Sequence, residues 1–171
     1  MPVLHALYTN VHIWRSVDQQ NVDEMLELSG IKMHRLAWER YDVLDDDRDH
    51  FTWAGFTRFA DDLVRLIASF CGKTLVIADS TIDHWNYNDD WQRNDMANMY
   101  MESLLPTIHV DAVWGSGFAA TRDNLTDFRT RLRNHSISNY DHVLFVGGWN
   151  DLNMKAALVE AAVWRVVAPV R

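Results

Sequence analysis

The sequence predicts an α/β protein whose core is a mostly parallel β-sheet. Short apolar runs, typical of buried strands, alternate along the chain with longer segments in which apolar residues recur at helical spacing. One run, residues 73–78, contains Leu75, Val76 and Ile77 in succession, a pattern that favours a strand buried on both faces at the sheet centre. We therefore expect a three-layer α/β/α sandwich around a five-stranded parallel sheet.

Five apolar runs are the expected strands, and a helical segment follows each of them. The strands span residues 3–8, 31–38, 73–78, 108–114 and 142–146. The helices are expected over residues 22–28, from Thr52 to Ile67, over residues 92–105, after Thr121 and from the neighbourhood of Asp151. Gly30 ends the first helix and Pro106 closes the third, as these residue types commonly do.

The helix that follows Thr52 carries the clearest signals. Thr52 is a favourable N-cap, and Phe51 and Phe56 are spaced to form a hydrophobic staple over it. Apolar residues then recur with the period of an α-helix at Phe56, Phe59, Ala60, Leu63 and Ile67. This stripe predicts a helix that packs one face on the sheet.

Composition limits the classes of function. With 171 residues, 48% of them hydrophobic, the chain is long enough for one domain over residues 1–171. A formal net charge of -8 disfavours nucleic acid as a partner, because affinity for it comes largely from neutralising phosphates. The single cysteine, Cys71, excludes an internal disulfide. No apolar run is long enough to span a membrane and residues 1–10 lack the features of a signal peptide, so we expect a cytoplasmic location.

Polar and small residues follow three of the expected strands. They are Asp79-Ser80, then Gly115-Ser116-Gly117, then Gly147-Gly148-Trp149-Asn150-Asp151. Ligands of open parallel sheets bind at the carboxyl ends of the strands, so these residues are candidates for a site. A serine hydroxyl, glycine N–H groups and an asparagine amide are parts of an acyl-transfer site. A base is offered by His50, which follows Asp47 by three positions.

In this combination the residues resemble the SGNH or GDSL-type hydrolases. Those enzymes carry a Gly-Asp-Ser block, a block with a glycine, a Gly-x-Asn-Asp block and an Asp-x-x-His block. The matching positions here are Ala78-Asp79-Ser80, Gly117 or Gly115, Gly148-Trp149-Asn150-Asp151 and Asp47-Arg48-Asp49-His50. Two departures stand out, because Ala78 replaces the first glycine and the Asp-x-x-His block precedes the serine instead of following it. The order is that of a circularly permuted chain, which compact domains tolerate when their termini lie near one another.

The resemblance implies a flavodoxin-like SGNH fold and a serine esterase that acts on a small O-acyl or lipid ester without a metal or other cofactor. Ser80 would be the nucleophile, His50 the base and Asp47 the residue that orients the base. Asp49 adjoins His50 as well, and only the spacing of the family block favours Asp47 over it. The oxyanion would meet the N–H groups of Ser80 and Gly117 and the side-chain amide of Asn150.

Two further expectations come from the same resemblance. Gly115 stays open as the alternative to Gly117 for the backbone donor. The permuted arrangement also predicts how the strands lie side by side: the strand at residues 108–114, then those at 73–78, 142–146, 3–8 and 31–38.

Several competing interpretations stay open. The same fold without catalysis would be a binding or structural module, since function resides in sites and not in folds. Asp79, Asp83 and His84 are a minor candidate for a metal site.

Four arginines after Thr121 are interpreted as a solvated face paired with surface carboxylates, namely Arg122, Arg129, Arg131 and Arg133. Tryptophans are expected beside the core at Trp38, Trp114 and Trp164, and around the site at Trp53, Trp85, Trp91 and Trp149.

Overall fold

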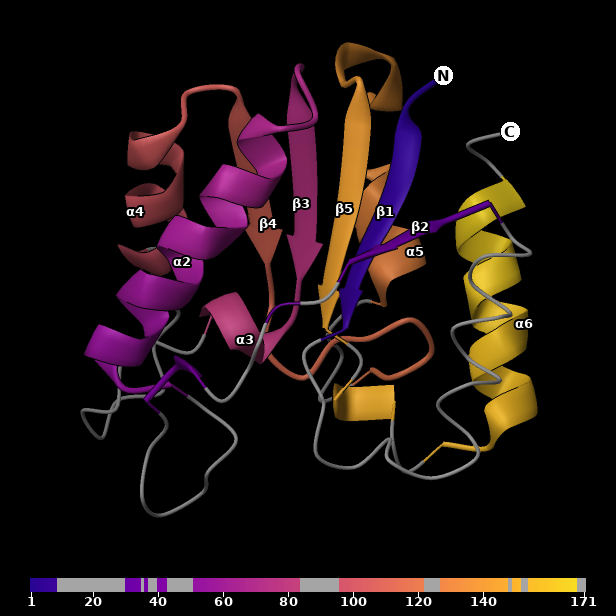
Figure 1. Cartoon of the computed structure of the whole chain (residues 1–171). Helices are drawn as coiled ribbons and strands as arrows, with labels where there is room; N and C mark the ends of the chain where they lie inside the picture. Colours follow the sequence, from indigo (N-terminus) through magenta and orange to yellow (C-terminus); the bar gives the residue numbers. More distant parts are fainter. Residues whose placement is uncertain are drawn as a thin grey trace.

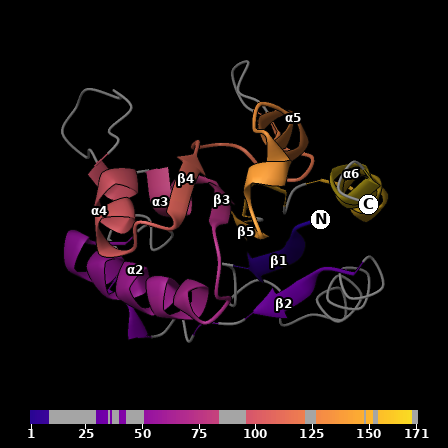
Figure 2. The same ribbon diagram turned by 90° about the horizontal axis from the view of Figure 1, so that it is seen from above.

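The structure of the protein, a computed structural model, describes residues 1–8, 30–34, 36, 40–42, 51–83, 96–121, 127–147, 149–151 and 154–168. Its centre is a five-stranded sheet in which each pair of neighbouring strands is parallel. Helices cover both faces of this sheet, and Figure 1 and Figure 2 show the layers from two directions. The predicted α/β class with a parallel sheet is confirmed.

The strands are β1 (Val3–Tyr8), β2 (Lys32–His34), β3 (Thr74–Ala78), β4 (Ile108–Ala112) and β5 (His142–Gly147). Four of them lie within two residues of the predicted boundaries, whereas β2 is described over only three of the predicted residues 31–38, of which 35, 37 and 38 lie outside the described part of the chain. Across the sheet the order is β2-β1-β5-β3-β4, which is the order predicted from the sequence. β5 is the middle strand, as this order predicted. β3, whose apolar run alone favoured the centre of the sheet, lies beside β5 inside the sheet and is buried at every position.

The helices divide between the two faces of the sheet. They are α2 (Trp53–Ala68), α3 (Ser80–Asp83), α4 (Met96–Leu104), α5 (Phe128–Arg133) and α6 (Ala156–Val167), with short 3₁₀ turns at Ile137–Asn139 and Trp149–Asp151. Viewed from above, α2 and α4 lie on one side of the strands and α5 and α6 on the other (Figure 2). Within the described part of the chain, no helix has both the length and the apolar character needed to cross a membrane.

Side chains alternate across each strand, so the core has two halves. In β3, Val76 and Ala78 pack with the buried residues of α2, whereas Leu75 and Ile77 pack with those of α5 and α6. A sheet covered on both faces needs apolar residues on both. This explains why β3 is a continuous apolar run and not an alternating one.

The start of α2 confirms the predicted N-cap. Thr52 has extended backbone angles, and its Oγ1 accepts a hydrogen bond from the Gly55 N–H at 3.0 Å. The predicted stripe is buried, since Phe56, Phe59, Ala60, Leu63 and Ile67 are almost completely shielded from solvent. The helix therefore packs on the sheet through the face that the sequence indicated.

Two helices begin later than expected. The N-cap of α5 is Asp127 and not Thr121, because the Asp127 carboxylate accepts from the Thr130 N–H at 2.7 Å. α6 begins at Ala156 rather than near Asp151, whose carboxylate bonds to a different part of the chain. The helix expected at residues 22–28 lies outside the described residues.

The expected placement of the tryptophans is only partly met. Trp164 on α6 is 40% exposed and not packed in the core. Trp114 is half-buried, in keeping with a place beside the core, and Trp53 is 43% exposed. Trp38, Trp85, Trp91 and the Trp149 side chain lie outside what the structure describes.

Three histidines form a row across β2, β1 and β5, which we call the histidine row: His34, His5 and His142. The Nδ1 of His5 lies 2.8 Å from Nε2 of His34, and the Nε2 of His5 lies 3.0 Å from Nδ1 of His142. The ring of Phe70 stacks on His5 with centroids 3.9 Å apart. Burial, together with the neighbouring histidines and Lys32, lowers the pKa of His5 to about 4. The central imidazole is therefore neutral in the folded protein at pH 7.

Candidate active site

The carboxyl ends of three neighbouring strands meet where the sequence predicted a site. Asp79 and Ser80 follow β3, Gly115 and Ser116 follow β4, and the turn with Asn150 follows β5. The three strands are adjacent and parallel, so these ends lie at the same edge of the sheet. Three of the four sequence blocks are therefore brought together.

Asp79 fixes the start of the short helix that carries Ser80. Its backbone N–H donates to Val146 O at 3.1 Å, which extends the pairing of β3 with β5 by one residue. Its carboxylate is buried and accepts from both the N–H and the hydroxyl of Thr81, at 2.9 and 2.6 Å. Ser80, the first residue of α3, is only half-buried and so is more accessible than its neighbours.

Asn150 connects the three strand ends. Its Nδ2 donates to the backbone oxygen of Ser116 at 2.9 Å and lies 3.5 Å from Oδ2 of Asp79. The first contact is an ordinary hydrogen bond, whereas the second is longer than most N–H···O bonds. One amide proton is therefore firmly held by Ser116, and the other is held only weakly.

Gly147 lets the backbone of β5 pass close to Asp79. Its φ of +151° lies in a region that side-chain-bearing residues rarely adopt. A Cβ at this position would lie 2.6 Å from Oδ2 of Asp79 and 3.0 Å from the ring of Phe128. The end of β5 needs glycine here, both for its conformation and for the space beside the carboxylate.

Asp151 holds the loop after β4, a role that the sequence did not predict. The buried carboxylate accepts three backbone N–H groups at 2.8 to 2.9 Å, from Phe118, Ala119 and Ala120. Burial raises the pKa of Asp151, although the three N–H bonds act in the opposite direction. A Cβ on Gly117 would lie 2.6 Å from the same carboxylate. Gly117 thus has a structural reason to be glycine.

The Gly117 N–H is hydrogen-bonded inside this loop, which disagrees with its expected role as a donor to the oxyanion. It donates to Ala120 O at 3.1 Å, and Gly117 O accepts from the Phe128 N–H at 2.9 Å. Gly115 has a φ of +71°, and its N–H makes no hydrogen bond to another described residue. Of the two glycines left open by the sequence, Gly117 is the one whose N–H is bonded within the described residues.

The expected base and its partner fall outside the described part of the chain. His50 and Asp47 both lie in residues 43–50, so their distance from Ser80 stays a prediction. Of the alternative metal candidate, His84 and the Asp83 side chain are likewise outside the described residues. The residues that are described contain no group of three or more His, Cys, Asp or Glu side chains able to hold a metal ion.

Sequence reasoning missed Arg131, which it placed on a solvated face. The residue is 2% exposed, and its guanidinium pairs with Asp111 of β4 at 2.8 Å. The available signal was Asp111 itself, because a carboxylate within an apolar strand needs a cationic or hydrogen-bonding partner. An arginine on the following helix was the nearest source of one.

Fold and site together define a parallel α/β protein with a polar cluster at the carboxyl edge of its sheet. Comparisons of the chain with protein-family models, with curated proteins and with solved structures gave no match.

Proposed function

We propose that the protein is a serine esterase of the SGNH hydrolase type, with circularly permuted block order, that forms an acyl-enzyme on Ser80. The observation that carries the proposal is the Asn150 amide, which bonds to Ser116 O and approaches Asp79. It joins three motif blocks that lie far apart in the sequence. Ser80 sits beside this junction, partly accessible at the first position of α3.

The strand order also supports the permutation. The order β2-β1-β5-β3-β4 was expected from a hydrolase whose chain begins at a different strand. In such a chain the segment with His50 precedes β3 in sequence yet returns to the carboxyl edge of the sheet. The proposal therefore requires residues 43–50 to approach Ser80 from the start of α2.

In the proposed reaction, the Ser80 hydroxyl attacks the ester carbonyl while His50, oriented by Asp47, accepts its proton. The negative oxygen of the tetrahedral intermediate is met by the Ser80 N–H, the weakly held amide proton of Asn150 and a glycine N–H. In place of Gly117, whose N–H is already bonded, we assign the last donor to Gly115.

The second half of the reaction releases the acid. His50 gives its proton to the leaving alcohol, and the acyl group stays on Ser80 as an ester. Water then attacks the acyl carbon while His50 takes a proton from it, and that proton returns to the Ser80 oxygen as the acid departs. No cofactor takes part in these steps, and the substrate class we propose is a small O-acyl or lipid ester.

Labelling with a fluorophosphonate probe tests the proposal. The wild-type protein should form a covalent adduct that maps to Ser80 by mass spectrometry, and Ser80→Ala should not. Ser103→Ala is the matched control, because Ser103 is an exposed serine on α4. It should label like the wild type. The same samples should hydrolyse nitrophenyl acetate with chelator present, and the rate should rise with pH as His50 loses its proton.

The second candidate is a binding module with the same fold. The observation that favours it is that two expected oxyanion donors, the Asn150 amide and the Gly117 N–H, already donate hydrogen bonds to acceptors within the protein. A site that satisfies its own donors needs no substrate oxyanion. Equal background hydrolysis by wild type and Ser80→Ala over acetyl, butyryl and longer esters, with no labelling of either, would replace the esterase by this module.

A further inference from the structure

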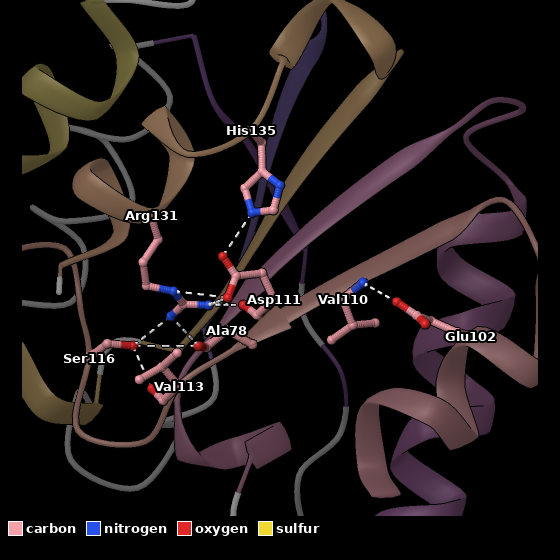
Figure 3. A network of polar contacts seen from close by, with 8 residues as sticks. All are labelled: Ala78, Glu102, Val110, Asp111, Val113, Ser116, Arg131 and His135. Atoms are coloured by element: carbon pink, nitrogen blue, oxygen red, sulfur yellow. Dashed lines mark hydrogen bonds and ion pairs between the residues drawn. The ribbon is translucent and has the colours of Figure 1, made fainter. Parts of the chain in front are cut away.

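Arg131 links parts of the chain that support the candidate site. Its Nη1 donates to the backbone oxygen of Ala78 and to the hydroxyl of Ser116, both at 2.8 Å. Its side chain is 3% exposed, and Figure 3 shows the guanidinium between α5 and the ends of β3 and β4. One buried side chain thus touches three elements.

The positive charge of Arg131 is paired with the carboxylate of Asp111 on β4. Its Nη2 and Nε lie 2.8 and 3.3 Å from Oδ1 of Asp111, and Nη2 also donates to the backbone oxygen of that residue. The other carboxylate oxygen of Asp111 lies 2.9 Å from Nε2 of His135 (Figure 3). Burial alone would raise the pKa of Asp111, but Arg131 and His135 together lower it. The pair is therefore ionised, and its geometry is fixed by several bonds at once.

The two groups bonded to Nη1 are the ones closest to the proposed chemistry. Ala78 O belongs to the residue directly before Asp79 and Ser80. Ser116 is the residue whose backbone oxygen holds the Asn150 amide. Arg131 therefore sets the end of β3 and the loop after β4 relative to each other, through groups that adjoin the nucleophile and the residue that holds the oxyanion donor.

We infer that Arg131 is a positioning residue, which fixes the separation between Ser80 and the Asn150 amide. The inference rests on the proposed esterase function. A displacement of reacting groups by about 1 Å can slow a reaction on the order of 10²-fold. Hydrogen bonds that hold the ends of β3 and β4 at a fixed separation should therefore raise kcat. A residue with only a structural role would change stability and leave the turnover of folded molecules as it was.

Two variants test the inference without emptying the buried site. Arg131→Lys keeps the positive charge beside Asp111 but cannot bond Ala78 O, Ser116 and Asp111 together, because lysine lacks the planar fork. Ser116→Ala removes only the hydroxyl and leaves the backbone oxygen that holds Asn150. Arg133→Lys is the matched control on the same helix, where the side chain is exposed.

The measurements are kcat and KM for a nitrophenyl ester and the rate of fluorophosphonate labelling, each at a temperature where unfolding curves show the variant folded. We expect kcat and the labelling rate to fall about 10-fold or more in Arg131→Lys, with KM unchanged within about 2-fold. Ser116→Ala should show a smaller fall of the same kind, and Arg133→Lys none.

Three results separate the possibilities. If wild type labels at Ser80 and the folded Arg131→Lys and Ser116→Ala variants label at the wild-type rate, Arg131 is structural and the inference is overturned. If Arg131→Lys does not fold, Ser116→Ala decides alone: slower labelling supports the inference and wild-type labelling refutes it. If wild type itself is not labelled, the esterase proposal fails first and the positioning role fails with it.

Discussion

Replacing Asp151 removes the acceptor that holds the loop after β4. The carboxylate accepts from three consecutive N–H groups, and each distance is 2.8 or 2.9 Å. In Asp151→Ala all three donors lose their partner inside the protein. In Asp151→Asn the amide oxygen can replace Oδ1, which serves Ala119 and Ala120, while the NH₂ group faces the Phe118 N–H and leaves that donor unpaired.

The size of each effect follows from the number of orphaned donors. A buried donor without an acceptor costs about 1–3 kcal/mol. Asp151→Ala orphans three donors, and water that enters the space can accept from some of them, so the free energy of unfolding should fall by about 3–5 kcal/mol. Asp151→Asn orphans one donor and should cost about 1–3 kcal/mol. Because burial raises the pKa of Asp151, its ionised form carries a desolvation cost that asparagine avoids, which places the Asn variant near the lower end.

Urea unfolding followed by tryptophan fluorescence measures these free energies. Asp127→Ala is a suitable control, since Asp127 accepts a single N–H bond as the N-cap of α5 and should cost about 1 kcal/mol. The expected order of destabilisation is Asp151→Ala, then Asp151→Asn, with the control no worse than the latter. A loss for Asp151→Ala no greater than for Asp127→Ala, with unchanged m-values, would show that the carboxylate does not hold this loop.

Three other predictions concern the histidine row and the strand ends. The pKa of His5 is about 4 in the folded state and close to 6.5 when unfolded, so the unfolded chain takes up the extra proton as pH falls. The contribution of His5 to the free energy of unfolding is fully present above pH 6.5 and is lost as the pH falls towards 4, by up to about 3 kcal/mol. Urea titrations at several pH values should show that the free energy of unfolding falls less steeply with acid in His5→Phe than in wild type. Gly147→Ala should cost about 1–3 kcal/mol in the same assay, because its Cβ would displace the Asp79 carboxylate; wild-type stability would contradict the close approach. Asn150→Ala should slow labelling of Ser80 by about 10²–10³, and an unchanged rate would remove its amide from the oxyanion site.

Short sequence patterns were enough to predict most of the helices and strands. Thr52 predicted the start of α2 because an N-cap bonds to a residue three positions away, within reach of a sequence pattern. The apolar run of β3 predicted a strand covered on both faces, which is what the structure shows. The strand order was predicted only through the permuted motif order, since spacing along the chain does not specify which strands become neighbours.

Long-range partners explain the failures. Asp151 looked like a helix start because a carboxylate there suits the helix dipole, yet its donors come from residues 118–120. Arg131 looked solvated within a basic stretch. Asp111 signals that its strand needs a cationic or hydrogen-bonding partner, but the sequence does not specify which arginine is buried beside it. Gly117 was assigned a free N–H, which a turn to Ala120 consumes. For Asp151 and Arg131 the partner lies in a different segment that no local pattern specifies. The partner of Gly117 is three residues away, in a loop that the distant Asp151 carboxylate holds.

The position of β5 has a consequence for how the chain reaches its folded state. The strand that comes last in the sequence is the one that joins β1 to β3, so the pairs β2–β1 and β3–β4 have no contact through the sheet until β5 is inserted. During synthesis, both facing edges stay unpaired until β5 has left the ribosome, a state prone to aggregation. Closure of the sheet is then a non-local, late event. Pulse-labelling hydrogen exchange during refolding should find the amides of β1 and β3 that face β5 becoming protected together with those of β5 and not before.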